Sequence, residues 1–82
     1  MYYVYLLESE TSGRYYIGHT QDITDRLMYH NTGRSVFTRG RGPWRMLAYR
    51  TFSTRSAAMK AEYKLKKMKD RKLIQEYFRI EA

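Results

Sequence analysis

Apolar and polar residues near the N-terminus follow a pattern that is typical of two paired strands. Residues 2–7 are rich in β-forming side chains and are apolar on both alternations, which predicts a strand covered on both faces. Residues 9–13 indicate a turn, and residues 15–18 return to β-forming side chains, so we expect an N-terminal hairpin. If its loop holds an even number of residues, Tyr5 and Tyr16 lie on the same face of the hairpin.

The following segment predicts a short helix, a loop and a third strand. Asp22 is suited to the N-cap of a helix of about ten residues, and Gly33 is suited to the position just past its end. His30 lies on the apolar stripe of this helix. Residues 34–43 form a basic, glycine-containing loop, and the alternation over residues 44–52 predicts a third strand.

The C-terminal part of the chain predicts a longer helix that carries an inward-facing acid. Ser53 or Thr54 is the expected cap, and a break at residues 69–70 separates this helix from a short final one. The apolar stripe of the longer helix consists of Ala58, Ala61, Leu65 and Met68. Glu62 points toward this stripe, and its charged neighbours on the helix are all lysines. A carboxylate facing a core needs a partner, and either a metal ion or an ion pair with one of the cations would satisfy Glu62.

The predicted element order is ββαβαα, which gives an α+β fold with a small, mostly antiparallel three-stranded sheet flanked by helices. A chain of 82 residues suffices for one modest core, so we expect a single domain over residues 1–82. No apolar run approaches the ~20 residues that span a bilayer, and the N-terminus lacks the features of a signal peptide. We therefore expect a soluble, cytoplasmic protein without a membrane partner; the pattern predicts no particular oligomeric state.

Composition excludes some chemistry and favours a polyanionic partner. The absence of Cys excludes disulfides, a thiolate zinc site and a cysteine nucleophile. Residues 1–33 carry a net charge of −2, whereas residues 34–82 carry +10. Such asymmetry is typical of proteins that bind nucleic acid on one face.

Five residues with chemical potential recur at the spacing of a known family. They are Tyr5, Tyr16, Arg26, His30 and Glu62. Together with the half-signatures Tyr3-Val4-Tyr5 and Tyr16-Ile17-Gly18, the chain resembles the GIY-YIG nucleases over nearly its whole length. It is most similar to the small single-domain members, which look like stand-alone forms of the nuclease domain in the bacterial excinuclease.

Two positions depart from that resemblance. Tyr3 replaces the glycine of the first half-signature, a change common in small members. Ile74 stands where larger members carry an asparagine, twelve residues after Glu62.

The resemblance implies a Mg²⁺-dependent (or Mn²⁺-dependent) DNA endonuclease, with low sequence specificity or with specificity for DNA structure, and a setting in DNA repair or recombination. Glu62 would bind the metal, and Arg26 would grip a phosphate oxygen. Tyr5 or Tyr16 would act as the base if nearby cations lower its pKa, while His30 is the alternative base or a proton relay. The expected partner is double-stranded or branched DNA.

Other residues have both a binding and a purely structural interpretation. His19 follows the second half-signature and is a candidate phosphate contact. Arg34, Arg39 and Arg41 fit a clamp on DNA phosphates, although they could be only a solvated surface. Phe37 and Trp44 could stack on a base, with a core position the more usual one for Trp at a strand start. The tyrosines and His30 could likewise be ordinary core residues.

Two other functions stay open from the residues alone. A non-catalytic nucleic-acid-binding module would keep the fold and the basic surface without cleaving its partner. A basic protein–protein adaptor is the third interpretation.

Overall fold

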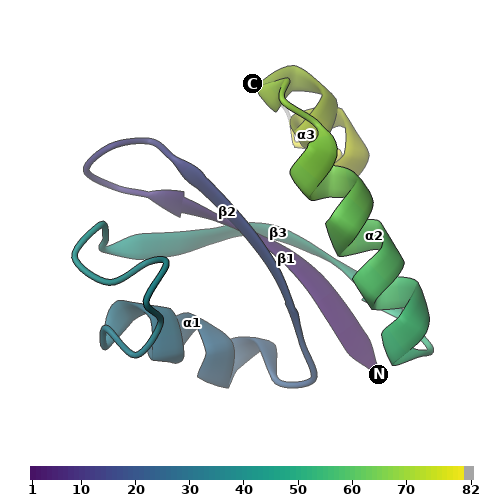
Figure 1. Cartoon of the computed structure of the whole chain (residues 1–82), viewed down its shortest axis with the longest axis horizontal. Helices are drawn as coiled ribbons and strands as arrows, with labels where there is room; N and C mark the ends of the chain where they lie inside the picture. Colours follow the sequence, from purple (N-terminus) through teal and green to yellow (C-terminus); the bar gives the residue numbers. More distant parts are fainter. Residues whose placement is uncertain (81–82) are drawn as a thin grey trace.

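A three-stranded antiparallel sheet forms the centre of the molecule, with helices on both of its faces (Figure 1). The computed structural model describes residues 1–80. Its elements are β1 (Tyr2–Ser9), β2 (Tyr15–Thr20), α1 (Ile23–Asn31), β3 (Trp44–Phe52), α2 (Arg55–Lys67) and α3 (Arg71–Phe78). The predicted order ββαβαα and the α+β class are confirmed.

The first strand is the middle strand of the sheet, whose order is β2-β1-β3. Val4, Tyr5, Leu6 and Leu7 are all buried, which confirms that β1 is covered on both faces. Tyr5 pairs with Gly18 and Leu7 pairs with Tyr16 in the antiparallel register. Because residues two apart on a strand share a face, this register places Tyr5 and Tyr16 on the same face of the sheet.

Local signals set the helix ends. Asp22 begins α1, and its carboxylate accepts a hydrogen bond from the Asp25 amide at 2.9 Å. Thr54 caps α2 in the same way through the Ala57 amide at 3.1 Å. Gly33, just past α1, has a φ of +78°, a conformation that glycine adopts without a steric penalty.

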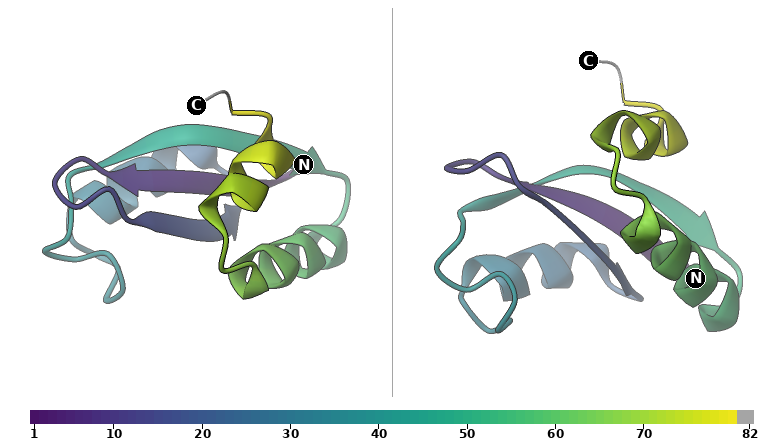
Figure 2. Two further views of the ribbon diagram at one scale, coloured as in Figure 1. Left: turned by 90° about the horizontal axis from the view of Figure 1, so that it is seen from above. Right: turned by 45° about the horizontal axis from the view of Figure 1, so that its top comes forward.

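Two hydrophobic clusters lie on opposite faces of the sheet. Val4 and Leu6 pack with Leu65 of α2 and with Phe78 of α3. Tyr5 and Leu7 belong instead to the cluster that Trp44 and α1 cover. Figure 2 shows α1 on one side of the sheet and α2 and α3 on the other. Residues on β2, an edge strand, can therefore meet both α1 and α2.

The structure shows where the two residues that depart from the family pattern, Tyr3 and Ile74, are packed. Ile74 is buried and belongs to the core under α3, so a polar asparagine is replaced here by a packing residue. Tyr3 is half-buried and packs edge-on against Tyr49 of β3, with ring centroids 5.4 Å apart. Across residues 1–80, none of the helices combines the length and the apolar character that a membrane crossing requires.

Candidate active site

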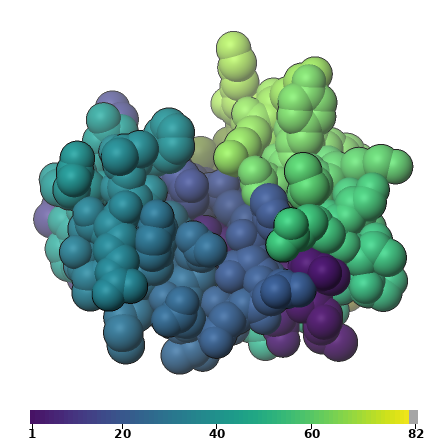
Figure 3. Space-filling model, turned by 60° about the horizontal axis from the view of Figure 1, so that its bottom comes forward, coloured from purple at the N-terminus to yellow at the C-terminus, as the bar shows by residue number. Residues whose placement is uncertain are grey.

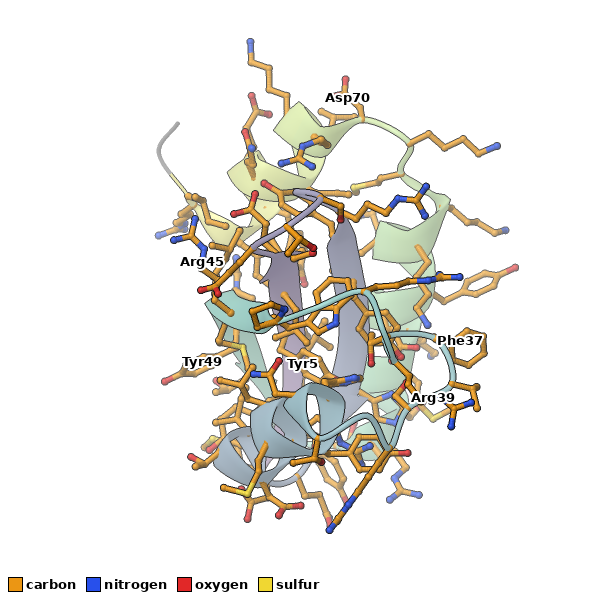
Figure 4. All side chains as sticks on the ribbon, turned by 90° about the vertical axis from the view of Figure 1, so that its left-hand side faces the viewer. Tyr5, Phe37, Arg39, Arg45, Tyr49 and Asp70 are labelled. Atoms are coloured by element: carbon orange, nitrogen blue, oxygen red, sulfur yellow. The ribbon has the colours of Figure 1, made fainter. Side chains whose placement is uncertain are left out.

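The ring of Tyr5 lies directly over Gly18, the glycine of the Tyr16-Ile17-Gly18 half-signature. A Cβ added at position 18 would overlap the Tyr5 hydroxyl and would come within 2.7 Å of the ring carbon that bears it. Only glycine leaves room for this ring at the paired position. The signature glycine therefore serves the placement of Tyr5, whose side chain is only 2% exposed (Figure 4).

A buried hydrogen-bonded chain connects Tyr5 to the loop after α1. The Tyr5 hydroxyl and His30 Nε2 share a hydrogen bond of 2.8 Å, and His30 Nδ1 shares one of 2.8 Å with the Thr38 hydroxyl. Thr38 is itself fixed, because its carbonyl accepts a hydrogen bond from the Trp44 indole at 3.0 Å. Both ring nitrogens of His30 are thus satisfied, and the ring is held in one orientation.

Burial sets the protonation states of this chain. Burial, with a smaller contribution from the positive charge of Arg26, lowers the pKa of His30 to about 4. Burial also raises the pKa of Tyr5 well above its ordinary value, with the nearby Tyr16 adding to the effect. At neutral pH, His30 is neutral and Tyr5 keeps its proton. The ring nitrogen of His30 that carries no hydrogen can then accept a proton from its hydrogen-bond partner.

Tyr16 completes the aromatic group at the edge strand. Its ring centroid lies 4.8 Å from that of His30 and 6.5 Å from that of Tyr5. Burial raises the pKa of Tyr16, while the ammonium of Lys66, 5.8 Å from the ring centroid, lowers it. The protein's own charges therefore do not produce the lowered tyrosine pKa that a tyrosinate base requires.

Glu62 reaches the same edge strand from α2. Its Oε1 lies 2.6 Å from His19 Nδ1, and its Oε2 lies 3.0 Å from Lys66 Nζ. The side chain of Glu62 is 18% exposed, so solvent reaches part of it. The structure contains the ion pair that the sequence left open, with Lys66 as the cation.

Glu62 could serve as one protein ligand of a divalent metal, but the described residues do not supply a complete set of ligands. Among residues 1–80, no group of three or more His, Asp or Glu side chains could hold a metal ion. Mg²⁺ commonly binds through one or two carboxylates and keeps several waters, so a single accessible carboxylate fits it. Glu62, with His19 beside it, is where such an ion could be held.

Arg26, a residue of α1, lies near Tyr29 and close enough to Tyr5 to affect its pKa. Its guanidinium sits 4.6 Å from the ring centroid of Tyr29, and its charge lowers the pKa of both Tyr5 and His30. A surface hollow is lined jointly by Arg26 and His19. Arg26 is therefore placed to meet an anion at the edge of the site.

The three loop arginines are all exposed. Arg34, Arg39 and Arg41 surround two buried anchors, Ser35 and Thr38. The loop lies beside the site, because Thr38 belongs to the chain that holds His30. Binding of DNA phosphates by these arginines stays a prediction, as does a phosphate contact for His19, which here contacts Glu62.

Sequence reasoning missed two residues of this arrangement. Lys66 lies one turn after Glu62, and the i, i+4 spacing of opposite charges is a signal that could have found their pair. Thr38 had no comparable signal, since its role depends on how the loop folds back on His30.

Comparisons with known proteins identify the family of this chain. The GIY-YIG catalytic domain family matches residues 1–76. A UPF0213 protein of Halalkalibacterium halodurans is 40% identical over 72 residues, which are 87% of this chain and 76% of that protein. A UPF0213 protein of Halobacterium salinarum is 38% identical over 69 residues, 83% of this chain and 88% of that protein.

A solved structure supports the same assignment. The solution NMR structure of the first of these relatives, there given the organism name Bacillus halodurans, matches with a TM-score of 0.56 and 40% identity, covering 92% of this chain and 81% of that one. The chain therefore belongs to the GIY-YIG family of nuclease-type catalytic domains, with UPF0213 proteins among its relatives.

Proposed function

We propose that this protein is a divalent-metal-dependent endonuclease that hydrolyses DNA phosphodiester bonds, with low sequence specificity or specificity for DNA structure. The observation that carries the proposal is the convergence at strand β2 of the Tyr5–His30 pair, Tyr16 and the Glu62 carboxylate. The net charge of the protein is +8, which favours binding of a polyanion such as DNA. Such an enzyme would serve DNA repair or recombination.

Phosphodiester hydrolysis requires an activated water and stabilisation of charge on the phosphate. A Mg²⁺ or Mn²⁺ ion bound at Glu62 would supply a Lewis acid for the phosphate oxygens. Arg26 can donate two hydrogen bonds in a fork to a phosphate oxygen pair. Arg26 lies on α1 and is half-buried, and it lines a surface hollow from which it could contact the DNA backbone.

The Tyr5–His30 pair provides a route for the proton of the attacking water. In the tautomer with hydrogen on Nδ1, the His30 ring donates to the Thr38 hydroxyl and Nε2 accepts from Tyr5. Tyr5 can then take a proton from water while passing its own proton to His30. No free tyrosinate is needed, which agrees with the raised pKa of Tyr5.

Tyr16 lies beside the Tyr5–His30 pair and is the second candidate to orient or deprotonate the water. Its ring lies near both the Lys66 ammonium and the His30 ring. Positive charge near Tyr16 favours its deprotonated form, so a cation held at Glu62 would assist Lys66 in lowering its pKa.

A non-catalytic nucleic-acid-binding module is the second candidate, and one observation favours it. Both carboxylate oxygens of Glu62 already have partners in His19 and Lys66. A role of Glu62 confined to this ion pair would leave a fold that binds nucleic acid without cleaving it.

Nicking of supercoiled plasmid tests the two candidates together. We expect nicked circles in Mg²⁺ and none in EDTA. Salt-sensitive gel shifts without nicks would support the binding module instead. A protein that neither nicks nor shifts DNA would favour the adaptor interpretation.

A further inference from the structure

A hollow of about 340 Å³ opens beside Tyr16, between the loop of residues 34–43 and α2. Figure 3 shows this face of the molecule hollowed between the teal loop and the green helix, with blue-purple β2 at its floor. Its cationic lining consists of Arg14 from the hairpin, Arg41 from the loop and Lys66 from α2. We name this space the β2 hollow.

The charge of the β2 hollow selects an anion. Three elements contribute one cation each, and no Asp or Glu is among the lining residues. Arg14, Arg41 and Lys66 are all exposed. The Lys66 ammonium also pairs with Glu62 at 3.0 Å, so it would contact a phosphate from within that ion pair. Cations from separate elements around one space suit the successive phosphates of a nucleic-acid strand.

The aromatic lining adds a second requirement, because one ring is free to bind. Phe37 is 68% exposed and projects outward from the loop (Figure 4). Tyr15, by contrast, is covered by the Arg71 guanidinium at 3.8 Å from its ring centroid, and its hydroxyl accepts a hydrogen bond from Gln75. Trp44 is buried. Tyr16 is half-buried and packs against His30 and Trp44. Phe37 is therefore the most exposed ring of the hollow.

The backbone under Phe37 is held rather than loose. The Phe37 carbonyl accepts a hydrogen bond from the Arg41 guanidinium at 3.3 Å, and the Arg41 carbonyl accepts one from the Ser9 hydroxyl at 2.6 Å. Thr38, next to Phe37, is fixed by His30. A preorganised exposed aromatic among arginines is the arrangement on which unpaired bases stack.

We propose that the β2 hollow binds one unpaired nucleobase against Phe37, while neighbouring phosphates contact Arg14, Arg41 and Lys66. This rests on the proposed function and deepens it. Tyr16 lines the hollow and is also one of the candidate catalytic residues. An unpaired nucleotide bound in the hollow would therefore lie next to the bond that is cut. The substrate class is then DNA with unpaired nucleotides beside the cleavage point. A base in an intact duplex would have to leave its stack first, at a cost of a few kcal/mol.

Binding measured in EDTA tests the proposal without requiring cleavage. Fluorescence anisotropy would compare a labelled hairpin duplex with a thymidine tail against the same duplex with an abasic tail of equal length. The two tails carry the same phosphate charge and differ only in the bases. We expect the thymidine tail to bind roughly 5- to 150-fold more tightly, the range that stacking on one aromatic ring gives.

Two matched variants assign the preference to one ring. Phe37→Ala should abolish the preference for the thymidine tail while the abasic tail binds as before. Val36→Ala is the control, because Val36 is adjacent, 69% exposed and outside the lining of the hollow; it should keep the preference. Both side chains are exposed, so circular dichroism should show no change in fold for either variant.

Several outcomes would overturn the proposal. Equal binding of both tails by the wild type, or no binding of either, removes the base from the interaction. A preference that survives Phe37→Ala, or one that Val36→Ala abolishes equally, removes Phe37 as the stacking ring. Failure of the nuclease proposal is separate: a thymidine preference in EDTA without plasmid nicking in Mg²⁺ would refute only cleavage, and nicking without a tail preference would refute only the hollow.

Discussion

Protonation of His30 should make the fold less stable in mild acid. Its side chain is 3% exposed and its pKa is lowered from the ordinary 6.5 to about 4. Between these values the unfolded chain binds a proton at His30 and the folded chain does not. The free energy of unfolding must then fall as the pH drops from 6.5 toward 4. Linkage over the range from pH 7.5 to 5 gives a loss of about 2 kcal/mol.

Urea denaturation at pH 7.5 and pH 5 measures this loss, and His30→Gln supplies the reference. Glutamine does not titrate, so the variant should lose about 2 kcal/mol less than the wild type over the same range. Other titrating groups, such as Glu8, whose pKa is lowered mainly by hydrogen bonding to Arg45, are common to both proteins and cancel in the difference. Parallel pH dependence of the two proteins would refute the reasoning. So would an NMR titration of His30 with its midpoint near 6.5.

Three further substitutions test other parts of the site. Gly18→Ala should lower the free energy of unfolding by about 1–3 kcal/mol in urea denaturation, because its Cβ overlaps Tyr5; an unchanged midpoint would contradict the close approach. Tyr16→Phe should reduce the plasmid-nicking rate roughly 100-fold or more without weakening DNA binding, and a wild-type rate would remove its hydroxyl from the mechanism. Arg39→Ala with Arg41→Ala should reduce the slope of log affinity against log salt by about one per lost phosphate contact; an unchanged slope would make these arginines solvated surface.

The fold was predictable because its signals are local. Capping residues such as Asp22 and Thr54 act within one turn, and the apolar residues on both alternations of the first strand predicted its cover on both faces. The common face of Tyr5 and Tyr16 depended on one unknown, the pairing register. Once the register is fixed, the two-residue period of a strand determines which side chains meet.

The parts of the site that sequence reasoning missed depend on contacts distant along the chain. Thr38 reaches His30 only because the loop folds back over α1, and no periodic pattern describes such a path. Phe37 was a candidate for base stacking from its type alone, but its open ring beside Tyr16 emerged only from the fold. The double engagement of Glu62 combines a local lysine with His19 from 43 residues away.

The proposed activity requires that the Glu62 carboxylate support metal-dependent cleavage of DNA. The most direct measurement compares plasmid nicking in Mg²⁺ by the wild type and by Glu62→Gln, at protein concentrations that bind the same fraction of DNA. Glu76→Gln, the same change at an exposed acid on α3, is the matched control. We predict that Glu62→Gln binds DNA, remains folded and does not nick, while the control nicks as the wild type does. Nicking by Glu62→Gln at the wild-type rate would show that cleavage does not depend on the Glu62 carboxylate.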